Sequence, residues 1–555
     1  MAQVIFDEPG QSDIVTNLPG TFTSGTNVNT LVGANRFYNA GFTGQGTITA
    51  NVEAGHIWSG HSTLGHVTSF AQDAAAWGST AGDLFDRHAT WVGQIIGGRA
   101  TSPTAATYQQ GIAYGTDLRS GAIATNWNGN AWSSSFSINV NSLNGGYQPY
   151  FGTADVINSS WGGTDPAGSS SWAVRMDGYA AQFSQTTFVV TAGNSGPGAN
   201  TVGFPGSGYN AITVGALTNG GNNSYNAVAT FSSRGPEDYF DPLHGTISGV
   251  RAAVDLAAPG DRLTAAYYGG QTGGNNTSLP GSAASGGPTF YSTNIQGTSF
   301  SAPIVAGGVA LVKSASYNTA GLASNAASRD TLVVKSVLMN SADRITGWSN
   351  GQVANGNGLG GVVTTQALDW ASGAGRLNLD RAFDQYLLAG TRDVAGLGSG
   401  DLGLVGNVGW DLGNVDLSGS NMYRIGGYLA ANSRFDVSLN WFRDRIYNPA
   451  NDAYADLGQA DLTLRVVDLV SNTVISESAS LYNTSELLSF VLPRTSQYGI
   501  EVVYGSNTFG SDAEVNYGIA WSGTAYLPDA GGSLLLVLLG VACMWLFFMG
   551  RARSR

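Results

Sequence analysis

The chain carries the side chains that acyl transfer by a serine requires. Such a reaction needs a hydroxyl activated by a neighbouring imidazole, a carboxylate that holds the tautomer of the imidazole, and donors that stabilise the oxyanion. The sequence QGTSFSAP at 296–303 precedes the apolar, small-residue run IVAGGVALV. Ser299 would therefore lie at the N-terminus of a buried helix, where backbone N–H groups and the helix dipole favour a developing negative charge.

The segment GTSFSAP at 297–303 resembles the nucleophile motif of the subtilisin-like serine proteases, the subtilases. An isolated serine at such a position is usually an ordinary N-cap residue. Seven matched positions before an apolar helix favour a nucleophile instead. The resemblance places the nucleophile on Ser299 and implies hydrolysis of peptide bonds in protein or peptide substrates through an acyl-enzyme, with no cofactor required.

A second segment, DRHATWVG at 86–93, resembles the helix start that carries the subtilase base. The resemblance assigns the base to His88 and makes Asp86 a candidate N-cap. Subtilases read His-Gly-Thr-His at this place, whereas Ala89 and Trp91 here replace the glycine and the second histidine, so this block is less specific.

The segment TAGNSGP at 191–197 follows the apolar run FVV and matches the family segment whose asparagine donates to the oxyanion. A surface turn would also favour Asn, Gly and Pro, but the buried strand before it favours the oxyanion role for Asn194. By the same resemblance, a cleft binds the extended substrate as an added strand. Its expected lining residues are Ser160, Trp161, Gly162, Ala192 and Gly193.

The carboxylate departs from the family pattern, because Glu53 stands where subtilases have an aspartate. The extra methylene moves the carboxylate by more than about an ångström unless the backbone compensates, and such a displacement can cost about a hundredfold in rate. Sedolisins use a glutamate but place an aspartate in the oxyanion hole, where this chain has Asn194. Asp83 and Asp86 are alternative acids, although both resemble loop or capping residues.

Metal binding is a further alternative for the closely spaced His56, His61 and His66, for which loop positions are the simpler interpretation, as for His244. Subtilases commonly bind calcium, and loops rich in Asp and Asn are plentiful here. None has a recognisable ligand spacing, so no metal residue is assigned.

The resemblance covers about residues 31–385, because FSSRGP, DLAAPG and GAGRLN follow in the family order at 231–236, 255–260 and 373–378. The order carboxylate, histidine, serine is that of subtilisin and differs from that of α/β-hydrolases. The main alternative to a protease is a pseudoprotease, a surface binding or adhesion module whose site has been eroded at Glu53, Ala89 and Trp91.

The elements that must position these residues follow an α/β pattern. Unbroken apolar runs are typical of strands covered on both faces, and helical spacing separates them. We predict a doubly wound, mostly parallel sheet, with surface insertions at 126–148 and 268–294. The predicted strands are 48–52, 155–160, 188–193 and 211–216, and the predicted helices include 91–96, 304–313 and 333–342.

The pattern changes after Phe383, and alternating segments such as RFDVSLNW and YGIEVVYG predict an all-β sandwich. The predicted organisation is an N-terminal extension (1–30), a peptidase domain (31–385), a Gly-rich linker (386–422), a β-sandwich accessory domain (423–526) and a C-terminal anchor (527–555).

The bulk composition restricts the partners and the location. The formal net charge is −13, only 11% of residues are charged, and no basic stripe precedes the last residues, which excludes nucleic acid as a partner. The single cysteine excludes an intrachain disulfide. Together these features indicate an exported, loop-rich protein.

The run 531–550 carries no charge and is followed by Arg551, Arg553 and Arg555. Its length, at about 1.5 Å per residue, suits one transmembrane helix, and the arginines would stay cytoplasmic, which places the rest of the chain outside. With LPDAG at 527–531, the segment resembles sorting signals read by exosortase-type transpeptidases, as an alternative to a plain membrane anchor.

The N-terminus lacks the basic start and apolar run of a secretory signal. We expect that such a signal lies upstream or has been removed. A folding pro-segment, which many subtilases need, is expected upstream too, unless the protein folds unaided.

Overall fold

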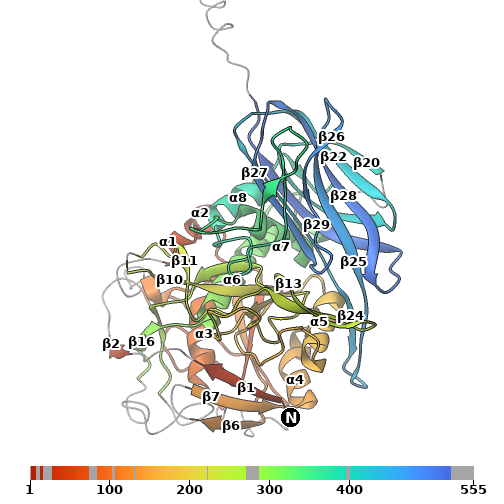
Figure 1. Cartoon of the computed structure of the whole chain (residues 1–555). Helices are drawn as coiled ribbons and strands as arrows, with labels where there is room; N and C mark the ends of the chain where they lie inside the picture. Colours follow the sequence, from red (N-terminus) through yellow and green to blue (C-terminus); the bar gives the residue numbers. More distant parts are fainter. Residues whose placement is uncertain are drawn as a thin grey trace, which may run out of the picture.

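The computed structural model describes residues 2–7, 13–16, 28–73, 84–102, 107–129, 133–221, 223–269, 287–394 and 400–526. Figure 1 shows an α/β body, coloured red to green, with a β-rich body in blue above it. No helix within the described ranges is long and apolar enough to cross a membrane. The predicted transmembrane anchor at 527–555 lies outside the described residues.

The α/β body is built on one twisted sheet with the strand order β11-β10-β9-β8-β3-β5-β4, in which β14 also pairs with β10. All pairings are parallel except that of β10 with β11. The predicted parallel α/β sheet is therefore confirmed. Its strands are β3 (Ile48–Glu53), β4 (Phe70–Ala71), β5 (Asp117–Ala122), β8 (Val156–Ser159), β9 (Thr187–Thr191), β10 (Ile212–Thr218), β11 (Ala227–Val228) and β14 (Leu256–Pro259).

Helices cover both faces of this sheet, because successive strand residues point to opposite sides. Val189 of β9 packs in the core that contains α3 and α6, whereas its neighbours Phe188 and Val190 pack against α4 and α5. The helices are α1 (Val28–Leu31), α2 (Asn35–Asn39), α3 (Arg87–Gly97), α4 (Val140–Tyr147), α5 (Ser171–Gln182), α6 (Thr298–Asn318), α7 (Thr331–Ser341) and α8 (Leu379–Leu387). Short 3-10 helices lie at Thr107–Gln109, Gln148–Tyr150 and Ala326–Arg329.

The stretch 126–148, predicted as a surface insertion, forms regular structure: β6 (Asn126–Gly129), β7 (Ser133–Ile138) and α4. The reason is local, since Asn139 and Ser142 form a capping box that starts α4. The N-terminal extension is tied down by strand pairing, with β1 (Ala2–Asp7) on β7 and β2 (Asp13–Thr16) on β16 (Phe290–Ile295). The remaining short strands are β12 (Glu237–Asp241), β13 (Gly245–Arg251) and β15 (Leu263–Ala266).

The β-rich body consists of two sheets around a separate apolar core. One sheet has the order β17-β18-β26-β25-β28-β22-β20, with β24 on β25, and the other has the order β19-β21-β29-β23-β27. The strands are β17 (Val353–Ala354), β18 (Val362–Val363), β19 (Thr391–Arg392), β20 (Gly400–Val405), β21 (Val408–Asp416), β22 (Ser420–Leu429), β23 (Arg434–Trp441), β24 (Asp444–Asn448), β25 (Ala453–Asp468), β26 (Thr473–Ser478), β27 (Ser485–Val491), β28 (Ser496–Phe509) and β29 (Glu514–Gly523).

The sandwich strands begin earlier than the sequence suggested. Strands β19, β20 and β21 lie within 386–422, the stretch predicted as a linker. Its glycines obscured the strand pattern, although every second residue from Asp411 to Val415 in β21 is buried. Glycine there is favoured by packing, because a Cβ at Gly409 would lie 2.2 Å from the ring of Trp521.

The two bodies share a tightly packed boundary. A Cβ at Gly178 of α5 would lie 2.6 Å from the backbone of Ile446 in β24, so only glycine permits this approach. Nearby, the buried Arg445 donates to Asp177 at 2.9 Å. Ser336 of α7 donates to the carbonyl of Gly518 at 2.8 Å. The sandwich therefore packs against α5 and α7, two helices that cover opposite faces of the α/β sheet.

Candidate active site

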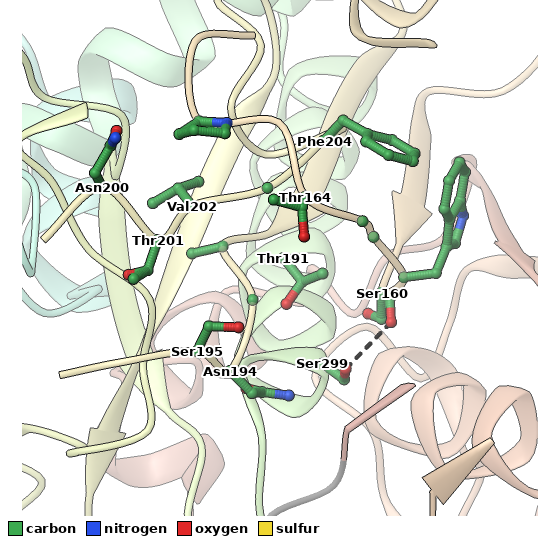
Figure 2. Close-up of a pocket in the computed structure, with 17 residues that line it drawn as sticks. Ser160, Thr164, Thr191, Asn194, Ser195, Asn200, Thr201, Val202, Phe204 and Ser299 are labelled. Atoms are coloured by element: carbon green, nitrogen blue, oxygen red, sulfur yellow. Dashed lines mark hydrogen bonds between the residues drawn. The ribbon is translucent and has the colours of Figure 1, made fainter. Parts of the chain in front are cut away.

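The predicted site residues meet at the carboxyl ends of three neighbouring parallel strands. Glu53 ends β3, Ser160 directly follows β8, and Asn194 lies shortly after β9. Ser299 faces them from the first turn of α6 and lines a cavity of about 320 Å³ together with Ser160 and Asn194 (Figure 2). Because ligands bind at the carboxyl ends of strands in open α/β sheets, this is where a substrate is expected.

Ser299 is held at the helix N-terminus that the sequence predicted. Gly297, the residue before α6, has φ of 152°, a conformation that favours glycine and turns the chain sharply into the helix. The Ser299 side chain is only 6% exposed, and its hydroxyl donates to the carbonyl oxygen of Ser160 at 3.1 Å. Ser299 thus borders the cavity, with its hydroxyl proton directed at the backbone.

His88 and Glu53 form a buried pair. Nδ1 of His88 lies 3.1 Å from Oε2 of Glu53, and the backbone N–H of Ser160 donates to Oε1 at 2.8 Å. Both carboxylate oxygens therefore have a partner, and the longer side chain reaches the imidazole. Asp86 accepts a hydrogen bond from the N–H of Ala89 and starts α3 as its N-cap.

Burial raises the pKa of Glu53, and the neighbouring His88 and the Ser160 N–H lower it. The carboxylate is fully buried, so its ionised form depends on those two partners. An imidazolium on His88 would be stabilised by the same carboxylate. The pair can therefore take up a proton during a reaction and return it.

The ring of His88 also packs beside Phe300, the residue after Ser299, with the two ring centroids 5.8 Å apart. Trp91, which replaces the second histidine of the motif, is fully buried and donates to Ser292 at 2.9 Å. That substitution therefore supports the fold behind the site.

Asn194 is oriented by the first residue of α6. Its Oδ1 accepts hydrogen bonds from the N–H and the hydroxyl of Thr298, each at 2.9 Å. The amide nitrogen consequently points the other way, and Figure 2 shows it directed toward Ser299. The Thr298 hydroxyl also accepts from the N–H of Gly193 at 3.1 Å. This arrangement can offer a donor to an oxyanion that forms on a substrate bound to Ser299.

The residues predicted to line the cleft all border the cavity: Ser160, Trp161, Gly162, Ala192 and Gly193. Trp161 does so with its indole buried, since this ring donates to the carbonyl of Val52 at 3.1 Å. The opposite wall, residues 200–204, was not predicted. Nothing in its sequence carries a catalytic pattern, and only its proximity to Asn194 along the chain could have suggested it.

The other histidines do not form a metal site within the described part of the chain. His56 contacts Ser120 and Gln72, and His61 contacts Thr63 and the carbonyl of Phe290. Burial lowers the pKa of each to about 4. Among the described residues, no group of three or more His, Cys, Asp or Glu is arranged to hold a metal ion. Asp83, the alternative acid, lies outside them.

Comparison with known proteins agrees with this geometry. The family model described as "Subtilase family" matches residues 53–371. The chain is 32% identical over 168 residues to pyrolysin from Pyrococcus furiosus, covering 29% of this chain and 11% of pyrolysin. It is 33% identical over 135 residues to subtilisin from Bacillus sp. (strain TA39), covering 24% of this chain and 30% of that protein. The matches thus span less than a third of either relative.

Proposed function

The chain belongs to the subtilase family, and we propose that it is a serine endopeptidase that hydrolyses peptide bonds through an acyl-enzyme on Ser299. The observation that carries the proposal is the buried Glu53–His88 pair. Ser160 links this pair to Ser299, since its N–H donates to Glu53 and its carbonyl accepts from Ser299, and Asn194 is oriented toward the same serine. These are the parts that acyl transfer by serine requires.

In the proposed reaction, Ser299 Oγ attacks the carbonyl carbon of the scissile bond while His88 takes its proton. Glu53 accepts a hydrogen bond from Nδ1–H of His88 and stabilises the imidazolium that forms. The negative charge on the carbonyl oxygen is stabilised by the Asn194 amide and the backbone N–H of Ser299. His88 then gives its proton to the leaving amine, and water, activated by His88, releases the acyl group.

One rearrangement must precede attack. The Ser299 hydroxyl donates to the Ser160 carbonyl at 3.1 Å, whereas the reaction needs that proton directed at His88. Rotation about the Cα–Cβ bond of serine exchanges staggered positions that are all low in energy. We propose that peptide binding along 160–162 takes up the carbonyl and releases the hydroxyl toward the imidazole.

The lining of the cavity favours substrates with uncharged side chains. Among the described residues, its walls carry Thr, Val, Phe, Pro and Gly but no Asp, Glu, Lys or Arg. A charged side chain would lose hydration there without gaining a partner. We therefore propose cleavage next to apolar or small polar residues.

The test is labelling of the purified full chain with a serine-directed fluorophosphonate, compared with Ser299→Ala. The proposal expects the parent to be labelled and to cleave casein, and the variant to lose both. A folded parent that refuses the reagent would show a pseudoprotease, the alternative function that keeps the fold and binds without turnover.

We also propose that the protein is exported and held at the cell surface by residues 527–555. The uncharged run 531–550 and the arginines after it support this proposal. Cell fractionation tests it: the full chain should sediment with membranes or envelope, and a chain ending at Tyr526 should be released. Processing by an exosortase-type transpeptidase would shorten the anchored form, whereas a plain anchor would keep its full mass.

A further inference from the structure

One wall of the cleft is tied to a single buried carboxylate. Thr201 and Val202 line the cavity opposite Ser160, as Figure 2 shows. Glu237, the first residue of β12, is 0% exposed and lies behind them. Its Oε1 accepts hydrogen bonds from the backbone N–H groups of Thr201 and Val202, both at 2.9 Å. The position of the wall therefore depends directly on this side chain.

Neighbouring backbone groups assist at the edge of the wall. The N–H of Asp238 donates to Oδ1 of Asn200 at 3.0 Å, and the N–H of Arg234 donates to the Thr201 hydroxyl at 3.0 Å. Val202 also packs in a small apolar cluster with Ala192, which itself lines the cavity. A displacement of the wall would therefore reach the segment that leads to Asn194.

The Glu237 carboxylate has few other hydrogen-bonding partners among the described residues. Its Oε2 is buried with no hydrogen-bond partner among the described residues. Arg251, opposite it on β13, directs its guanidinium to the carbonyl oxygens of Ser207 and Gly208, at 2.7 and 3.2 Å. A buried carboxylate is costly unless it is hydrogen-bonded, and within the described part of the chain the hydrogen bonds to this carboxylate come from the cleft wall.

We propose that Glu237 is a positioning residue for substrate binding: it holds the 200–204 wall and so sets the affinity of the cleft for peptides. The inference rests on the proposed function of the cleft as a peptide-binding site. Glu237 does not contact the reacting atoms, so its replacement should change binding and KM much more than the chemical step.

The charge state of Glu237 predicts a second observable effect, a pH dependence of peptide binding. Burial raises the pKa of Glu237 to about 7, while the Val202 N–H, Arg251 and the Thr201 N–H lower it and Asp238 raises it slightly. The wall 200–204 carries no titratable side chain. Because an ionised carboxylate accepts hydrogen bonds more strongly than a neutral acid, the wall should be held more firmly above about pH 7.

The experiment measures binding of a blocked fluorescent tetrapeptide of Ala and Phe to the full chain carrying Ser299→Ala, so that turnover plays no part. In this background, affinity should rise several-fold from pH 6 to pH 8. Adding Glu237→Gln, which keeps an acceptor oxygen but cannot ionise, should abolish this rise. Adding Glu237→Ala should weaken binding at pH 8 by about tenfold, the loss expected for a charged hydrogen bond.

The matched control is Glu486→Gln, which removes another buried glutamate, in β27 of the sandwich, and should leave the pH dependence of binding unchanged. Equal affinity of the parent and Glu237→Ala, or an unchanged pH profile in Glu237→Gln, would overturn the proposal. If Glu237→Ala fails to fold, the pH dependence of peptide binding by Glu237→Gln tests the proposal by itself. Failure of the proposed protease function would give a different result. The natural chain would then bind the peptide but would not be labelled by the fluorophosphonate.

Discussion

Two fully buried glutamates, one in the cleft and one in the sandwich, show what distinguishes a reactive region from a structural one. Burial raises the pKa of both Glu53 and Glu486, the latter to about 8. Glu53 faces an imidazole at 3.1 Å. Glu486 accepts hydrogen bonds from the hydroxyl of Ser478 and the N–H of Ser480.

The partners differ in what they can do with a proton. An imidazole can gain and release one near neutral pH, whereas a serine hydroxyl and a backbone amide cannot. Glu53 also ends a parallel strand and accepts from the N–H of Ser160, which lines the cavity. Glu486 lies in β27, which pairs antiparallel with β23 in the sandwich. A raised carboxyl pKa therefore marks burial in both regions, and only the neighbouring histidine and serine make one of them a candidate for catalysis.

The largest expected effect on kcat comes from Glu53, the glutamate beside His88. Glu53→Gln should lower kcat about ten-thousandfold, because an amide stabilises the wrong imidazole tautomer and cannot balance the imidazolium. The measurement is the steady-state rate on a peptide substrate, with circular dichroism to confirm folding. A rate within tenfold of the parent would show that another group, such as Asp86, orients His88.

The next effect concerns the oxyanion donor. Asn194→Ala should lower kcat by about 10²–10³ with little change in KM, because the amide acts on charge that develops only in the transition state. The control is Asn414→Ala, which removes an exposed amide of β21 that donates to Asn516 in the sandwich. An effect confined to KM would place the Asn194 side chain in ground-state binding.

A smaller effect tests whether glutamate fits the site. Both oxygens of Glu53 have partners on different elements, at 3.1 and 2.8 Å, so a shorter side chain would withdraw from them. Glu53→Asp should therefore slow fluorophosphonate labelling, by up to about a hundredfold. Faster labelling of this variant would show that the natural glutamate makes Ser299 less reactive than an aspartate would.

The smallest effect on catalysis is expected for Glu486→Gln in the sandwich, which should change stability instead. The pKa of Glu486 is about 8 in the folded protein and 4.5 as an ordinary value, so the folded state keeps a proton that the unfolded state releases. Stability of the parent therefore falls as pH rises from about 4.5 to about 8. Glu486→Gln removes this loss. The free energy of unfolding of the variant, relative to that of the parent, should therefore increase by on the order of 2 kcal/mol from pH 5 to pH 9.

Thermal unfolding at the two pH values measures this gain, and kcat and KM should stay at the parent level. The amide oxygen of the variant can still accept from the N–H of Ser480, and its NH2 can donate to the hydroxyl oxygen of Ser478, so packing is preserved. A gain that is the same at both pH values would mean that ionisation of Glu486 does not contribute.

Much of the molecule could be predicted from local patterns. The apolar runs at 48–52, 188–193 and 211–216 overlap β3, β9 and β10, and RFDVSLNW coincides with β23. Such runs are informative because a strand covered on both faces must be apolar throughout. The stretches 126–148 and 386–422 were harder, since Gly, Asn and Ser also occur in strands whose neighbours leave no room for a larger side chain.

The sequence by itself determined which residues can do chemistry, because Ser299, His88 and Asn194 each lie in a short segment whose local structure follows from its own residues. Only the tertiary structure decided whether Glu53 reaches His88, since that distance depends on how β3 and α3 pack. It also revealed Glu237, whose partners lie 35 and 36 residues away. Contacts of that kind are set by the fold as a whole, and no spacing along the chain encodes them.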